Sequence, residues 1–113
     1  MVLFVDDLPE NLALFKAVAG TLPHRTHHSP FEALKCLSGR SARVIVTDHD
    51  MPGMTGAEFI VYARRLCPDA RIIMVSSAPP EHFSCAEQPD EVVTKPFDAI
   101  ELRRKIKKIV AAA

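Results

Sequence analysis

Short apolar runs alternate along the chain with longer segments in which apolar residues recur at helical spacing. The runs are rich in β-branched residues and stop at charged or hydroxyl residues, which is typical of short buried strands. On this pattern we expect strands over residues 1–5, 44–47, 72–75 and 91–94. Residues 24–28 predict a further strand that is weaker and more polar.

The segments that follow the strands have the features of helices. Pro9 suits the first turn of one helix, and Gly20 is a suitable stop for it. Ser29 followed by Pro30 has the pattern of an N-cap and a first helical residue. We therefore expect helices over residues 9–19, 31–37 and 57–66, and a last helix that Asp98 caps.

The alternation of strands and helices predicts an α/β fold. Successive βαβ units are right-handed and build a parallel sheet with helices on both faces. Most of the predicted strands are apolar throughout, which favours burial on both sides. No internal repeat or low-complexity linker interrupts the 113 residues, so we expect a single domain over residues 1–113.

Composition and charge exclude several classes of protein. Fourteen basic residues balance fourteen acidic ones, which argues against binding nucleic acid or an anionic membrane through bulk positive charge. The three cysteines have no CxxC spacing and are expected to be reduced thiols. The apolar runs are too short to cross a membrane, and we expect a cytoplasmic protein.

Four strands end in residues that can carry chemistry. Asp6 and Asp7 follow the first strand, Asp48 the third, Ser76 the fourth and Lys95 the fifth. Ligands of open α/β sheets bind beyond the carboxyl ends of the strands, so these side chains are expected to share one rim. Clustered carboxylates predict a Mg²⁺ site, and a lysine and a hydroxyl beside it favour a phosphoryl group as the substrate. Asp48 is the best-placed nucleophile.

These residues also carry a resemblance. The chain resembles the bacterial two-component response-regulator receiver domain in Asp6-Asp7, in the run from Asp48 to Gly56, in Ser76 and in Lys95-Pro96-Phe97. The resemblance covers nearly the whole chain. It implies a flavodoxin-like (βα)5 doubly wound sandwich with a five-stranded parallel sheet in the order 2-1-3-4-5.

The resemblance also implies a role for each residue. Asp48 would accept a phosphoryl group from a phosphohistidine on a sensor histidine kinase or a histidine phosphotransfer domain. Asp7 and Asp48 would bind Mg²⁺ directly, with the backbone carbonyl of Asp50 as a third ligand and Asp6 acting through water. Lys95 would pair with the phosphoryl oxygens, and Ser76 would donate a hydrogen bond to one of them. The Lys95–Pro96 peptide bond is expected to be cis.

On this interpretation the chain is a signalling phosphoacceptor and not a turnover enzyme. It would control a downstream protein or an output domain, as a monomer or weak dimer, without binding nucleic acid or membrane itself.

The chain departs from the family pattern at several positions. Val92 stands where an aromatic residue usually takes part in the switch, and Ser77 stands where alanine is more common. The interval from Ser76 to Lys95 is short, so we expect a short or irregular fourth helix. Asp50 adds a carboxylate beside the acceptor and is expected to alter the rate of phosphoryl hydrolysis.

Two other functions remain open from the sequence. A haloacid-dehalogenase-like phosphohydrolase would use Asp48 as the nucleophile and Asp50 as the acid/base, although Pro52 and the early acidic pair disfavour this class. A degenerate receiver would bind partners without phosphorylation.

Two further groups of residues have a plain structural interpretation. The histidines at positions 24, 27 and 28 are not expected to share a metal, because alternate residues of a strand point to opposite faces. The basic run on the last helix is most simply a solvated face, with partner docking as the alternative. The run comprises Arg103, Arg104, Lys105, Lys107 and Lys108.

Overall fold

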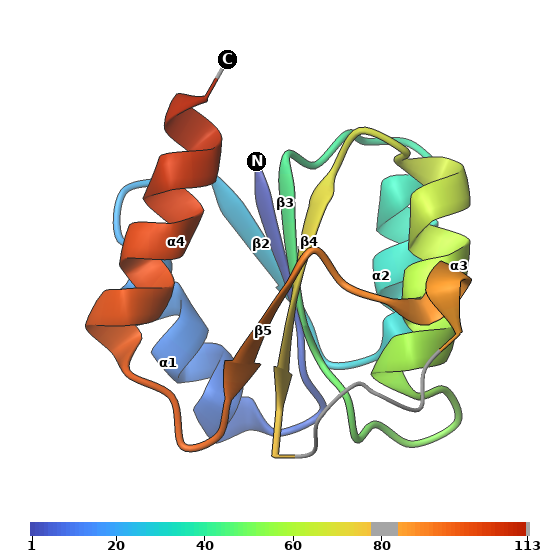
Figure 1. The fold of residues 1–113 in the computed structure, drawn as a ribbon, viewed down its shortest axis with the longest axis horizontal. Helices are drawn as coiled ribbons and strands as arrows, with labels where there is room; N and C mark the ends of the chain where they lie inside the picture. The colour runs from blue at the N-terminus through green and yellow to red at the C-terminus, as the bar shows by residue number, and fades with distance from the viewer. Residues whose placement is uncertain (78–83, 113) are drawn as a thin grey trace.

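The computed structural model describes residues 1–77 and 84–112, and these form a five-stranded parallel sheet between two layers of helices (Figure 1). The strand order is β2-β1-β3-β4-β5, which confirms the expected flavodoxin-like topology. The strands are β1 (Val2–Val5), β2 (His24–His27), β3 (Val44–Asp48), β4 (Arg71–Ser76) and β5 (Glu91–Thr94). The helices are α1 (Pro9–Ala19), α2 (Pro30–Leu37), α3 (Gly56–Leu66) and α4 (Ala99–Ala111), with a short 3₁₀ turn, η2 (Cys85–Glu87).

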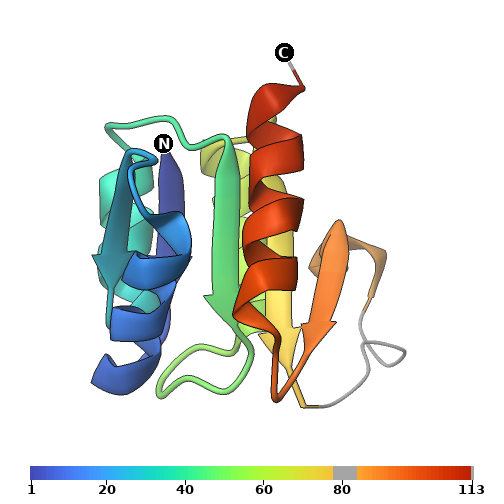
Figure 2. The same cartoon turned by 90° about the vertical axis from the view of Figure 1, so that its left-hand side faces the viewer.

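The sheet separates two apolar cores. Helices α1 and α4 cover one face and helices α2 and α3 the other, with η2 beside α3 (Figures 1 and 2). Side chains of β1 alternate between the two cores, with Leu3 and Val5 on the α2–α3 side and Val2 and Phe4 on the α1–α4 side. All four are buried, as expected for a strand covered by helices on both faces.

The helix boundaries follow from local capping. The Ser29 hydroxyl accepts a hydrogen bond from the Phe31 amide, and the Asp98 carboxylate accepts from the Ile100 amide, so both expected caps are confirmed. Helix α3 begins one residue earlier than expected because Thr55 and Glu58 form a reciprocal capping box. Strand β2 ends at His27, one residue earlier than the sequence predicts.

The chain between β4 and β5 contains only one described helical turn, η2. This agrees with the expected short or irregular fourth helix, and residues 78–83 of the interval lie outside the described residues. Asp90 anchors the start of β5: its carboxylate accepts the Ile72 amide at 2.7 Å, and its own amide donates to the Ile72 carbonyl at 2.8 Å. Arg64 donates to the same carboxylate at 3.3 Å. Strand β5 is thus fixed to β4 and α3 by polar contacts before its ladder begins.

The helices of the described ranges are all too short or too polar to span a membrane.

Candidate acidic phosphoryl-transfer site

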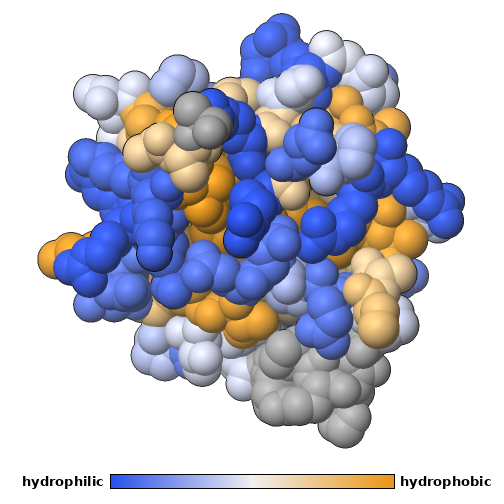
Figure 3. Space-filling view, turned by 45° about the horizontal axis from the view of Figure 1, so that its top comes forward, coloured by the Kyte–Doolittle hydropathy of each residue, from blue (hydrophilic) through white to orange (hydrophobic). Residues whose placement is uncertain are grey.

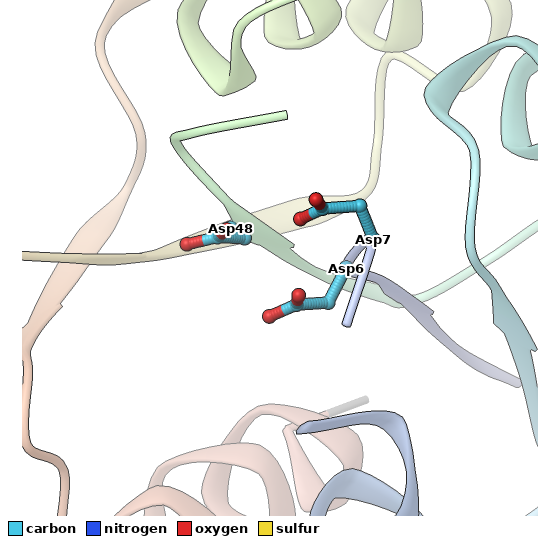
Figure 4. A group of neighbouring side chains, drawn as sticks. All are labelled: Asp6, Asp7 and Asp48. Carbon is cyan, nitrogen blue, oxygen red and sulfur yellow. The ribbon is translucent and has the colours of Figure 1, made fainter. Parts of the chain in front are cut away.

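Three carboxylates meet at the carboxyl edge of the sheet. Asp6 and Asp7 follow β1, and Asp48 is the last residue of β3, the central strand. One oxygen from each lies within 4.8 Å of the others, and Figure 4 shows the three side chains gathered beyond the two strand ends. The parallel register places them together, since Val5 lies opposite Thr47, the residue before Asp48. These are the carboxylates that the sequence predicts at this rim.

Asp6 is fully buried, and both of its oxygens are hydrogen-bonded. Oδ1 accepts the Leu8 amide at 2.9 Å, and Oδ2 accepts the side-chain amide of Asn11 at 3.0 Å. Burial raises the pKa of Asp6 above its usual value, and the negative charge of Asp48 raises it further, while the two hydrogen bonds oppose the shift. The site therefore concentrates negative charge that a cation would stabilise.

Lys95 supplies the counter-charge. Its Nζ donates to Oδ1 of Asp48 at 2.6 Å, and the Asp48 carboxylate is only 3% exposed. Burial by itself would lower the pKa of Lys95, but the hydrogen bond to Asp48 and the charges of Asp48, Asp6 and Asp50 together raise it above its ordinary value. The lysine is therefore a fixed ammonium that touches the proposed nucleophile.

Ser76 and Lys95 are held side by side through the backbone. Ser76 ends β4, lies opposite Thr94 of β5 and is almost fully buried. The Lys95 amide donates to the Ser76 carbonyl at 2.9 Å. The Lys95–Pro96 bond is cis, as the resemblance implies. Strand pairing thus sets the lysine and the hydroxyl at the same rim as the carboxylates.

The loop after Asp48 returns close to its own start. The Gly56 amide donates to the His49 carbonyl at 2.7 Å, and Gly53 adopts a φ of 81°, which favours glycine. A Cβ atom on Gly56 would lie 2.4 Å from the Asp48 carbonyl oxygen. The loop path therefore requires the absence of a side chain at position 56.

The donor set fits a hard divalent cation. Within residues 1–77 and 84–112, Asp6, Asp7 and Asp48 are the only group of three or more potential ligand side chains. Carboxylate oxygens are the ligands that Mg²⁺ prefers. The repulsion between Asp6 and Asp48 contributes to the raised pKa of Asp6, and a bound divalent cation would relieve this repulsion. Asp50 is exposed and its side chain is outside the group, so the predicted ligand at that position remains its backbone carbonyl.

Sequence reasoning missed Asn11. It lies in the first turns of α1, where asparagine is a poor helix former, and this mismatch is the only signal of a special role. In the structure its side chain orients the Asp6 carboxylate.

We expect Asn11→Ala to weaken Mg²⁺ binding about tenfold, because partners that orient metal ligands typically affect affinity on that scale. The loss of the hydrogen bond also frees Asp6 to rotate and raises its pKa further. A Mg²⁺ titration followed by backbone amide shifts measures the change. Lys16→Ala, at an exposed position of the same helix, is the matched control, and equal affinities in the two variants would contradict the role of Asn11.

Comparisons with known proteins show what the chain is similar to. The family profile described as "Response regulator receiver domain" matches residues 2–107. A CheY-like response regulator receiver domain protein from Methanospirillum hungatei is 25% identical, with a TM-score of 0.87 over 95% of this chain and 90% of that chain. Chemotaxis response regulator CheY4 of Vibrio cholerae is 24% identical, with a TM-score of 0.84 over 96% of both chains.

A third solved structure is the BeF3-activated receiver domain of DrrB. It is 20% identical, with a TM-score of 0.85 over 96% of this chain and 95% of that chain. The comparison with curated proteins gives no match.

Proposed function

The chain belongs to the response regulator receiver domain family, and from this premise we propose that Asp48 is its phosphoacceptor. Members of this family are signalling domains. The donor we propose is a phosphohistidine of a sensor histidine kinase or a histidine phosphotransfer domain. The phosphorylated domain would then control a downstream protein or an output domain.

The observation that carries this proposal is the environment of the Asp48 carboxylate. It is nearly buried, lies 2.6 Å from the Lys95 ammonium and is a member of the three-carboxylate group. A nucleophile needs this kind of positioning, because phosphoryl transfer depends mainly on orientation and charge neutralisation.

In the proposed reaction an oxygen of the Asp48 carboxylate attacks phosphorus and forms an O–P bond. The N–P bond of the phosphohistidine breaks, its electron pair returns to the imidazole nitrogen, and that nitrogen takes up a proton from the solvent to give neutral imidazole. Lys95 moves its hydrogen bond from the carboxylate to a phosphoryl oxygen, and the Ser76 hydroxyl donates to another. The buried Asp6 is a further carboxylate beside the acceptor.

Mg²⁺, bound by Asp7 and Asp48 with the Asp50 carbonyl and with Asp6 through water, would neutralise phosphoryl charge when present. The hydrogen bonds that the Asp6 carboxylate accepts from Leu8 and Asn11 support this proposed role, because they fix its orientation.

The phosphohydrolase alternative needs Asp50 as a general acid/base. Asp50 is exposed and lies outside the carboxylate group, which disfavours this role. The degenerate-receiver alternative is disfavoured because Asp6, Asp7, Asp48, Ser76 and Lys95 are all present at one rim.

The test is incubation of the protein with Mg²⁺ and a small phosphoramidate, followed by intact mass measurement. We expect an acid-stable, base-labile phosphoryl adduct that forms with Mg²⁺ and not when EDTA removes it. Turnover of p-nitrophenyl phosphate should be negligible. Absence of the adduct, or sustained turnover of the ester, would refute the proposal.

We further propose that residues 1–113 act as one cytoplasmic domain, as a monomer or weak dimer.

The conformational response to phosphorylation is proposed to differ from an aromatic switch. Two features support this: the β4–β5 connection is short, and Val92, half-buried on β5, is not aromatic.

Asp50→Asn should lengthen the phosphoryl lifetime about two- to fivefold, since removing a nearby negative charge relieves about 0.5–1 kcal/mol of repulsion. Adduct decay followed by mass spectrometry measures it. Asp69→Asn, an exposed position at the opposite edge of the sheet, is the matched control, and an unchanged lifetime in Asp50→Asn would contradict this prediction.

A further inference from the structure

A groove lies at the amino-terminal edge of the sheet, at the opposite ends of the strands from Asp48. It has a volume of about 870 Å³. One wall is α4 from Glu101 onward, and the other is the end of α3 with the turn into β4. The starts of β3, β4 and β5 lie between them. Figure 3 turns this edge toward the viewer and shows hydrophilic side chains with apolar surface among them.

The side chains that line the groove carry a net positive charge. Three carboxylates, Asp69, Glu91 and Glu101, line the groove with five cationic side chains. The five are Arg43, Arg71, Arg104, Lys105 and Lys108. Counted together they carry a net charge of +2 (five minus three). This is a local excess in a chain whose formal charge is zero.

Two of the three groove carboxylates already form ion pairs with groove cations. Glu101 accepts from Arg104 at 2.9 Å, and Glu91 lies 3.5 Å from Lys105. At the far end of the groove, Arg43 donates to the Ala112 carbonyl at 2.8 Å. Within the described ranges Lys108 has no ion pair. Arg71 in turn lies 3.7 Å from Asp90, which does not line the groove. The groove cations without an ion pair among the described residues are therefore Lys108 and Arg43, at the end of the groove where the last turns of α4 approach Arg43.

The basic run of α4 divides between two faces. Lys108 lies three residues after Lys105 and four after Arg104, so it is next to both on the helix surface, and all three line the groove. Arg103 and Lys107 do not line it. Only part of the run is thus an ordinary solvated face.

Apolar surface lies between the charges. Ala42 and Cys67 are buried beneath the groove, whereas Leu66 is 44% exposed on the α3 side. Pro68, Ile109 and Ala112 complete the apolar lining. An apolar floor with cations along one wall is complementary to a segment that combines carboxylates with apolar side chains.

We propose that this groove is a docking site for a short acidic and apolar segment of a partner protein. Carboxylates of the segment would pair with Lys108 and Arg43, and its apolar side chains would cover Leu66 and the floor. The site is separate from the phosphoryl-transfer site, because the two lie at opposite edges of the sheet. It needs no phosphorylation, so it can be tested independently of the proposed reaction.

The probe is a capped synthetic peptide that alternates glutamate and leucine, titrated into unphosphorylated isotope-labelled protein. We expect saturable shifts of backbone amides over residues 41–43, 66–71 and 104–112, and weaker binding at high salt. A peptide with lysine in place of glutamate should bind at least fivefold more weakly. Absence of saturable shifts, or equal binding of the two peptides, would overturn the proposal.

The matched variants are Lys108→Glu, inside the groove, and Lys107→Glu, one residue away and outside it. Both are exposed and change the charge equally. We expect Lys108→Glu to raise the Kd at least fivefold and Lys107→Glu less than twofold. Equal effects would show attraction to the net charge of α4 alone and would refute a defined site. Binding of anionic vesicles with the same Lys108 dependence, without peptide binding, would replace the partner segment with a membrane surface.

Discussion

Asp48→Asn is expected to abolish formation of the phosphoryl adduct completely. The amide is nearly the same size as the carboxylate, so the buried position is still filled, but it is a poor nucleophile and cannot form the aspartyl phosphate. Lys95 loses its charged partner at 2.6 Å, and the repulsion that Asp48 exerts on Asp6 disappears. Intact mass measurement after exposure to a small phosphoramidate and Mg²⁺ gives the result directly.

Asp50→Asn is the matched control for this experiment, since it removes one carboxylate two residues away from an exposed position. It should keep the adduct that Asp48→Asn loses. Thermal unfolding of both variants verifies that they are folded. An adduct that persists in Asp48→Asn would show that the acceptor is another residue.

Gly56→Ala is expected to lower the free energy of unfolding by about 3 kcal/mol, the upper part of the range for forcing an extra group into a packed site. Gly56 does not have a positive φ, and alanine is the better helix former, so backbone conformation gives no reason for the loss. The reason is steric, because the new Cβ would lie 2.4 Å from the Asp48 carbonyl oxygen and 2.8 Å from the His49 Cα. Both are main-chain atoms that cannot rotate away.

To make room for the new Cβ, the backbone that carries Asp48 must therefore shift. We expect phosphorylation to slow along with the loss of stability. Gly39→Ala is the control, since no atom lies within 4 Å of a Cβ at that position, and its unfolding free energy should stay within about 0.5 kcal/mol of the parent. Urea unfolding measures both, and equal stabilities would contradict the steric argument.

The fold and the rim of the site could be predicted because each depends on where strands end. Asp48, Ser76 and Lys95 close or directly follow apolar runs, and parallel strands bring their carboxyl ends to one edge. The order of the sheet could not be derived from these runs and came from the resemblance. The polar strand β2 was predicted to within one residue, although its side chains are only partly buried.

Other features of the site and of the groove depend on how helices and strands pack together. The spacing of apolar residues along the sequence does not encode this packing. The contact of Asn11 with Asp6 requires a particular rotation of α1 over β1. The requirement for glycine at position 56 depends on the path of a whole loop. The basic groove is built from the ends of α3, α4 and three strands, so no local stretch of sequence indicates it.

The hydrogen bond from the Leu8 amide to Asp6 gives the domain a built-in spectroscopic reporter. This amide precedes α1 and touches one oxygen of Asp6, a member of the carboxylate group. Any event that redistributes charge on that oxygen must alter the shielding of the amide proton. One resonance at the start of α1 can therefore report the electrostatic state of the rim in real time, without a dye or a label on a partner.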